Sequence, residues 1–246
     1  MLSVDLHIHT LYSGHAYGTI EEMALAARRR QIKIIAITDH GPAMPGAPHR
    51  FYFGNLGNLP PFIHGVEVLR GVEANVISHS GEIDLANRYL EALDWVAIGL
   101  HDDCLEPMST EQNTHSVIAA IETGLIDVVV HPGNPRFPLD YEKLVLATAK
   151  AGIAIEINNS SLVMPHRRGS APNCLEIAEL AAKHNVKIVL GSDAHSQWQI
   201  GDLDEAHKLA LQAGVRNEQI LNYSPERVKI FLQKRGKKRY ANYTAR

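Results

Sequence analysis

The chain has 246 residues, of which 45% are apolar and 21% are charged, and its formal net charge is −3. Because α/β barrels commonly reach this length undivided, we expect residues 1–246 to form a single domain. The negative charge argues against a broad basic surface, so nucleic acid is not a favoured partner. The two cysteines, Cys104 and Cys174, lack paired spacing, which argues against a disulfide framework or a thiolate zinc site.

The sequence favours a protein of the cytoplasm. Met1 runs directly into the strand-like residues 2–6, without the basic and apolar regions of a secretory signal. The longest apolar runs fall far short of the roughly 20 residues that cross a bilayer. We therefore expect no membrane partner, and the sequence leaves formation of a homo-oligomer open.

Short aliphatic runs alternate along the chain with segments whose apolar residues recur every three or four positions. Seven runs are predicted strands, at residues 3–8, 33–38, 66–72, 95–100, 128–131, 153–157 and 187–190. Helices are predicted at residues 20–30, 83–92, 114–123, 141–151, 174–184, 203–213 and 225–233. This alternation is typical of a parallel α/β sheet, and seven strands suggest a ring.

The sequence also allows predictions for two other segments. Residues 41–61 are rich in Gly, Pro and Asn, and an irregular stretch of this length is usually a lid or flap that helps to select a ligand. The basic tail begins at about residue 234, and its run 234–239 is predicted to be a solvated end.

Possible metal ligands follow successive predicted strands. On a strand, His7 and His9 share one face, and most of the other candidates lie where later strands end. Unrelated core or surface histidines would not be placed in this way. Because parallel strands end at the same edge, we expect one metal site built from His7, His9, His15, His40, Glu73, His101, His131, Asp193 and His195.

The chemistry of this set favours divalent ions. Imidazole and carboxylate without thiolate suit zinc, and manganese or iron are alternatives. If Glu73 bridges two ions, the nine residues provide about ten bonds to metal. Shared among three ions, these bonds leave each coordination shell incomplete, so water or substrate can bind there. Three dications would bring about six positive charges, and two carboxylates with one hydroxide would offset about three. The excess favours an anionic substrate such as a phosphate.

In chain order, the sequence contains the motifs HxH and TDH, a Glu at a strand end, two single His and a terminal DxH. With this ordered set it resembles the polymerase and histidinol phosphatase (PHP) family over nearly its whole length. It is most similar to the small stand-alone members named as probable phosphatases, the YcdX-like subgroup. The resemblance implies a distorted (β/α)7 TIM-like barrel with a trinuclear, usually zinc, centre at the carboxyl ends of the strands.

By the same resemblance, the first ion would be held by His7, His9, Glu73 and Asp193. The second would be held by Glu73, His101 and His131, and the third by His15, His40 and His195. The implied reaction is hydrolysis of small phosphate monoesters by a metal-activated hydroxide.

Residues around this centre are assigned roles as hypotheses. Glu73 and Asp193 are counted as catalytic through the ions, and Asp102 and His166 are candidates to protonate the leaving oxygen. Candidates to bind the phosphate are Arg167, Arg168 and Arg50. Asn158, Asn159 and Ser160 either contact substrate or cap a turn.

Three alternatives stay open. A phosphodiesterase or nuclease would use the same centre, with the basic tail as its support. An amidohydrolase-like barrel also opens with HxH, although such sites usually add a carboxylated lysine between the ions. A non-catalytic barrel could keep the ions only to stabilise a binding module.

Overall fold

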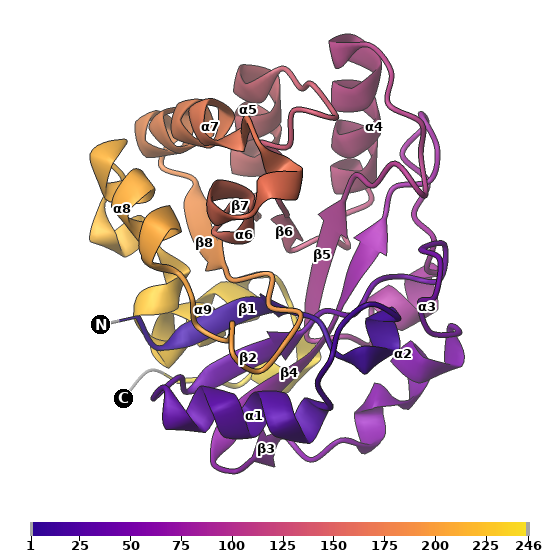
Figure 1. Cartoon of the computed structure of the whole chain (residues 1–246), viewed down its shortest axis with the longest axis vertical. Coiled ribbons are helices and arrows are strands. Elements are labelled where there is room, and N and C mark those ends of the chain that lie inside the picture. Colours follow the sequence, from indigo (N-terminus) through magenta and orange to yellow (C-terminus); the bar gives the residue numbers. More distant parts are fainter. Residues whose placement is uncertain (1, 245–246) are drawn as a thin grey trace.

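The computed structural model describes residues 2–244, apart from the side chain of His166, and its strands and helices alternate along the chain (Figure 1). The strands are β1 (Val4–Ile8), β2 (Ile34–Ile37), β3 (Phe62–Ile63), β4 (Val66–Asn75), β5 (Trp95–Gly99), β6 (Val128–Val129), β7 (Ala154–Asn158) and β8 (Lys187–Gly191). The helices are α1 (Ile20–Arg29), α2 (Phe51–Asn55), α3 (Asn87–Leu90), α4 (Thr110–Glu122), α5 (Tyr141–Ala151), α6 (Ser160–Val163), α7 (Ser170–His184), α8 (Asp204–Gln212) and α9 (Pro225–Lys234).

The seven predicted strands form a parallel sheet in the order β1-β2-β4-β5-β6-β7-β8. Between β1 and β8, the backbone N–H of His9 donates to the carbonyl of Ala194 at 2.8 Å, and Ile8 forms a single parallel bridge with Ala194. The sheet is therefore nearly closed into an α/β TIM-like barrel, which confirms the predicted fold. The short strand β3, which was not predicted, pairs antiparallel with β4.

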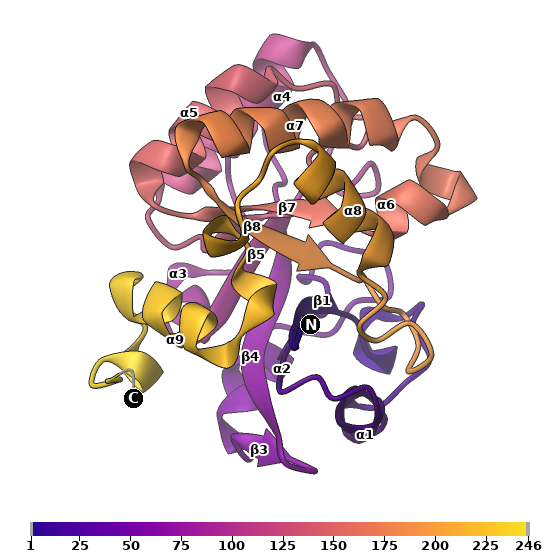
Figure 2. The same cartoon turned by 90° about the vertical axis from the view of Figure 1, so that its left-hand side faces the viewer.

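The helix α9 closes the barrel at the amino-terminal ends of its strands. Val228 and Phe231 are buried in one apolar cluster with Leu6, Leu69 and Trp95 from three different strands. The rings of Trp95 and Phe231 lie 6.0 Å apart. Figure 2 shows α9 and the C-terminal end of the chain on the same side of the molecule. The interior of the barrel at this end is therefore filled with apolar side chains.

Capping residues are found at the ends of several predicted helices. Thr19 and Glu22 form a capping box at α1, Gly152 ends α5 with a left-handed φ of 64°, and Ser224 caps α9. Two starts differ from prediction, because α4 begins at Thr110 and α7 begins at Ser170.

The helix predicted at residues 83–92 is wrong for most of its length, since only α3 is helical there. The carboxylate of Asp84 accepts hydrogen bonds from the backbone N–H groups of Ala43 and Asn75, both at 2.9 Å. Ile83 forms an antiparallel bridge with Val76. These tertiary contacts hold residues 83–84 out of the helical conformation that their apolar spacing favours.

The stretch 41–61 is more ordered than the sequence indicates. It contains α2, followed by a 3₁₀ turn at Leu56–Asn58, and Phe53 is buried. Phe53 and Leu56 belong to the main apolar core, which explains why a segment rich in Gly and Pro is held in place.

The prediction of a solvated basic tail is also wrong, because three side chains of residues 234–239 turn inward. Asp127, which is fully buried just before β6, pairs with Lys237 at 2.6 Å and with Arg235 at 3.3 Å. Arg235 also donates to the carbonyl oxygen of Ile126 at 2.7 Å. A buried carboxylate needs such partners, which the sequence pattern of the tail alone does not reveal.

Arg239 completes this arrangement on the neighbouring strands. Its guanidinium lies 2.8 Å from Asp94, just before β5, and 3.1 Å from Glu67 in β4. Arg70 and Lys229 pair with the same two carboxylates. The basic run therefore ties three adjacent strands together at the end of the barrel that α9 covers.

Within residues 2–244, no helix is both long enough and apolar enough to cross a membrane.

Replacing Arg239 by alanine should lower the free energy of unfolding by about 2 kcal/mol, because two buried carboxylates lose one of their cations. Urea unfolding of the metal-free protein measures the change. The control is Lys183→Ala, since Lys183 and Glu142 are both mostly exposed and their pair is 3.7 Å long. That variant should change stability by no more than about 0.5 kcal/mol. Equal effects of the two substitutions would contradict the structural role of the tail.

The pH dependence of stability should report on Asp94. Burial alone would raise the pKa of Asp94, but the hydrogen bonds from Arg70 and the charge of Arg239 outweigh it and lower the pKa. A lowered folded-state pKa contributes stability above the unfolded value of about 4, and this is lost as pH falls through the folded value. Asp94→Asn should therefore destabilise the protein at neutral pH, and the difference from wild type should shrink in acid. A difference that stays constant down to pH 3 would exclude this linkage.

Candidate metal centre

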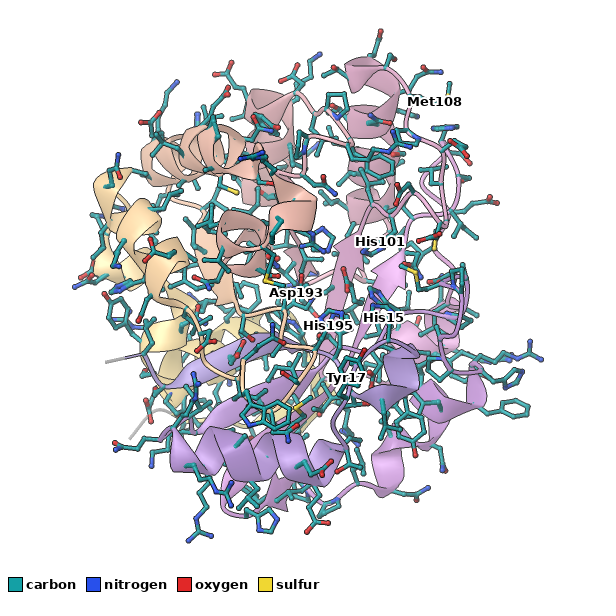
Figure 3. The ribbon with its side chains drawn as sticks, viewed as in Figure 1. His15, Tyr17, His101, Met108, Asp193 and His195 are labelled. Atoms are coloured by element: carbon teal, nitrogen blue, oxygen red, sulfur yellow. The ribbon has the colours of Figure 1, made fainter. Side chains whose placement is uncertain are left out.

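The predicted ligands come together at the carboxyl ends of the strands. In Figure 3, His15, Asp193 and His195 lie close together near the centre of the molecule, and His101 lies beside them. Four overlapping groups of three residues have donor atoms within 4.8 Å of one another: His9, His40 and His195; His7, His9 and Asp193; His7, Glu73 and His131; and His40, Glu73 and His101. His15 is in none of these groups, but its ring lies 4.9 Å from that of His195 and 5.2 Å from that of His40.

The carboxylate of Glu73 lies at the centre of the cluster and is fully buried. Its Oε1 lies 2.6 Å from His131 Nε2 and 3.0 Å from His101 Nε2. Its Oε2 lies 3.2 Å from nitrogen atoms of His7, His9 and His40. Each oxygen therefore faces a different set of imidazoles, which is the arrangement of a carboxylate that bridges two ions.

Several imidazoles are held by the nitrogen that points away from the cluster. In metal sites, such outer hydrogen bonds fix the tautomer and leave the other nitrogen free to bind an ion. The Nδ1 atoms of four histidines have partners of this kind, namely His7 with Glu156 Oε1 at 2.7 Å, His9 with Ser13 Oγ at 3.0 Å, His101 with Asn75 Oδ1 at 2.8 Å and His195 with the Asp193 carbonyl at 2.8 Å.

The imidazole nitrogens that point into the cluster are better placed to bind cations than to form hydrogen bonds with one another. His7 Nε2 and His9 Nε2 lie 3.1 Å apart, and two imidazole nitrogens at this distance need a shared proton or cation. His40 Nδ1 and His101 Nε2 are buried beside the oxygens of Glu73, but within the described residues neither has the geometry of a hydrogen bond. Buried polar atoms are rarely left without partners, so the donor set suits divalent metal ions.

Electrostatics indicate that the cluster already attracts positive charge. Burial would raise the pKa of Glu73, but the surrounding imidazoles, His40 and His101 first, hold it well below its usual value. Burial would lower the pKa of His9, but hydrogen bonds to Asp193 and Glu73 outweigh it and raise the pKa to about 9. Protons thus occupy positions where cations would bind, and metal binding must displace them.

Other ligands stay neutral and ready to coordinate. Burial, helped by the charge of Arg167, lowers the pKa of His131 to about 4. Burial and the charge of His9 lower the pKa of His195 to about 4 as well. Since metals bind the neutral imidazole, these two residues need no deprotonation at neutral pH.

The backbone is strained at two of the ligands. His131 has a φ of 35° and Asp193 a φ of 54°, values that residues other than glycine rarely adopt. Below them, Gly99 leaves room for the cluster, because an added Cβ would lie 2.7 Å from Glu73 Oε1 and 2.9 Å from His131 Cε1. Strain of this kind is typical of functional sites, where the surrounding structure holds the residue in place.

Arg167 is the predicted phosphate ligand that lies within the site. Its Nη1 is 2.9 Å from Asp193 Oδ2 and donates to Ser161 Oγ at 3.2 Å and to Asn158 Oδ1 at 3.4 Å. Asn158 in turn donates to both Asp193 and Glu156. All side-chain contacts of Arg167 among the described residues use Nη1, so Nε and Nη2 can donate to a bound anion.

The remaining candidates do not join the cluster. Arg168 is exposed, and Arg50 is exposed with its guanidinium 5.5 Å from the ring of Phe51. Asp102 is also exposed and pairs with Arg136 at 3.3 Å. Asn159 Oδ1 accepts from the backbone of Ala206, which is a structural role, and Ser160 is buried as the first residue of α6. The side chain of His166 lies outside the described part of the chain.

Sequence reasoning missed Glu156, which is 1% exposed in the middle of β7. One carboxylate oxygen contacts His7 Nδ1, and the other accepts from the backbone N–H of His131 at 2.7 Å. A carboxylate inside the run Ala-Ile-Glu-Ile-Asn, which is buried on both faces, was a usable signal.

Comparison with known proteins gives consistent results. The sequence profile described as the PHP domain matches residues 5–160. A "Probable phosphatase" of Acetivibrio thermocellus is 45% identical over 232 residues, covering 94% of this chain and 95% of the relative. "Probable phosphatase TTE1963" of Caldanaerobacter subterraneus is 47% identical over 238 residues, covering 96% of this chain and 93% of the relative.

Two solved structures resemble the fold. One is histidinol phosphate phosphatase from Lactococcus lactis, complexed with zinc, L-histidinol and phosphate, with a TM-score of 0.58 and 14% identity over 87% of this chain and 94% of that one. The other is a chain in an archaeal ribonuclease P bound to mature tRNA, with a TM-score of 0.56 and 15% identity over 94% of this chain and 90% of that one. At this identity they support the fold alone, whereas the profile match and the full-length relatives show that the chain belongs to the PHP domain family.

Proposed function

We propose that the chain is a metal-dependent phosphatase that hydrolyses phosphate monoesters of small molecules, an activity of class EC 3.1.3, with three divalent ions. The observation that carries the proposal is the position of the Glu73 carboxylate, because its two oxygens face separate sets of imidazoles. Zinc suits these ligands, with manganese and iron as alternatives. The names of the full-length relatives and the zinc and phosphate in the histidinol phosphate phosphatase structure support the same class.

The first two ions would share Glu73. We assign the first to His7, His9, Glu73 and Asp193, and the second to Glu73, His101 and His131. The third is assigned to His40 and His195, with His15 as a further ligand. His9 also lies near the third group, but Ser13 occupies its Nδ1, so it has one nitrogen to offer and is kept for the first ion.

Bound ions would supply Lewis acidity and hydroxide at neutral pH. The chain itself contributes fixed charges and donors. Glu73 stays ionised among the imidazoles, and Glu156 holds both His7 and the backbone of His131 in place. Arg167, anchored by Asp193, would direct its free N–H groups at the oxygens of the phosphate, where its planar fork suits their geometry.

Monoesters fit the site better than nucleic acid does. A monoester phosphate carries close to two negative charges, which would offset the positive excess of the ions. The basic tail, the main sequence support for a nuclease, is engaged at the opposite end of the barrel, where Arg235, Lys237 and Arg239 pair with buried carboxylates. The proposed substrate is therefore a small phosphorylated molecule.

Removal of the metal should abolish hydrolysis of p-nitrophenyl phosphate, and zinc or manganese should restore it. Hydrolysis of bis-p-nitrophenyl phosphate should be slower than that of the monoester. Preference for the diester would overturn the monoester assignment, and turnover that survives complete metal removal would overturn the mechanism.

His131→Ala should abolish activity and lower the metal content of the purified protein, as measured by elemental analysis. His115, exposed on α4, provides the matched control, and His115→Ala should retain both properties. Wild-type metal content in the His131 variant would remove that residue from the ligand set.

Arg167→Ala should lower kcat/KM by about 100-fold, as expected for loss of a preorganised donor to the reacting group. Arg167→Lys should recover only part of this loss, because lysine keeps the charge but not the fork. The exposed Arg168 serves as control, and Arg168→Ala should stay close to wild type. Metal content must be measured in each variant, since Arg167 also holds Asp193. A wild-type kcat/KM for Arg167→Ala at full metal content would exclude its role.

A further inference from the structure

Asp39 lies between Thr38 and the ligand His40, is fully buried, and has no cationic partner among the described residues. Its charge is instead met by neutral donors. Thr10 donates to it twice, from the backbone N–H at 2.7 Å and from the hydroxyl at 2.8 Å. The Ser13 hydroxyl donates at 2.7 Å and the Tyr52 hydroxyl at 2.6 Å. Four hydrogen bonds can stabilise a buried carboxylate, but each must point its hydrogen at Asp39.

This constraint fixes the proton on the neighbouring ligand. The Ser13 hydroxyl has one hydrogen, and it is committed to Asp39 Oδ1. Ser13 Oγ can therefore only accept from its other neighbours, the backbone N–H of His40 at 3.3 Å and His9 Nδ1 at 3.0 Å. His9 must carry a hydrogen on Nδ1. In neutral His9, the lone pair then lies on Nε2, which faces Glu73 and Asp193 at 3.2 Å.

The fourth donor comes from the stretch expected to be a lid. Tyr52 lies on α2, and the centre of its ring lies 4.7 Å from that of Tyr12, with the two rings tilted by 34°, beside a cavity of about 570 Å³. Among the described residues, the Tyr52 hydroxyl is the only group of α2 that donates a hydrogen bond to Asp39, since the other donors belong to residues 10–13, just after β1. The position of α2 therefore affects how well the charge of Asp39 is met.

We propose that Tyr52, Asp39 and Ser13 form a hydrogen-bonded relay that holds His9 in its metal-binding tautomer, which makes α2 part of the metal centre. These are positioning residues, because they act through His9. The inference deepens the proposed function and rests on its metal centre, but it does not depend on the choice of substrate.

The decisive comparison is Tyr52→Phe against Tyr12→Phe. The first substitution removes only the hydroxyl that reaches Asp39. The second removes a hydroxyl from the neighbouring ring, and the Tyr12 hydroxyl has no hydrogen bond among the described residues. Zinc affinity is measured by competition with a chromophoric chelator, without substrate. Tyr52→Phe should weaken zinc binding measurably, but by less than the roughly tenfold loss expected when a direct outer partner of a ligand is removed, and Tyr12→Phe should not change it. Equal affinities of the two variants would overturn the proposal.

A second measurement tests the tautomer directly. In a long-range ¹H–¹⁵N spectrum of the zinc-loaded protein, His9 should carry its proton on Nδ1, and Ser13→Ala should weaken zinc binding while the metal-free protein still unfolds cooperatively. A His9 proton on Nε2 would overturn the relay. Zinc binding that follows these expectations in a protein without phosphatase activity would support the relay and count against the proposed function alone.

Discussion

One buried carboxylate organises the functional end of this molecule. Glu73 is buried, and among the described residues no Lys or Arg forms an ion pair with it, so its charge must be balanced by the histidines that surround it or by ions held among them. The outer nitrogens of three of these histidines are in turn hydrogen-bonded to Glu156, Ser13 and Asn75. Glu73 therefore lies at the centre of the cluster, and the buried carboxylates of Glu156 and Asp193 contact His7 and His9 beside it.

The barrel separates this polar end from an apolar one. At the amino-terminal ends of the strands, α9 fills the interior with Phe231 and its apolar neighbours. At the carboxyl ends, the imidazoles gather around Glu73, and Arg167 joins them through its ion pair with Asp193. The same strands serve both ends, because their first residues supply apolar side chains to the core and the candidate metal ligands lie near or just beyond their carboxyl ends.

Much of the fold was predictable from local patterns, because parallel strands buried on both faces leave continuous apolar runs in the sequence. The candidate metal ligands were also visible in the sequence, since they follow successive apolar runs, and the fold brings donor atoms of His7, His9, His40, Glu73, His101, His131, Asp193 and His195 close together. What local patterns could not supply were contacts between distant residues. The hydrogen bond from Ala43 to Asp84 holds a helical pattern in an extended conformation, the contacts of Glu156 depend on His7 and His131, and the proposed relay through Asp39 depends on the placement of Tyr52. Each of these depends on a partner from another element of the fold.

The basic run near the end of the chain also has a consequence for how the protein is made. Arg239 reaches Glu67, which precedes it by 172 positions, and Arg235 reaches Asp127, which precedes it by 108. During synthesis, β4 and β6 leave the ribosome before these cations exist, so the carboxylates of Glu67 and Asp127 need water as their partner until then. Asp94 differs, because Arg70 precedes it in the chain and can pair with it earlier. The ion pairs of Glu67 and Asp127 with the basic run can therefore form only after the last part of the chain has been made.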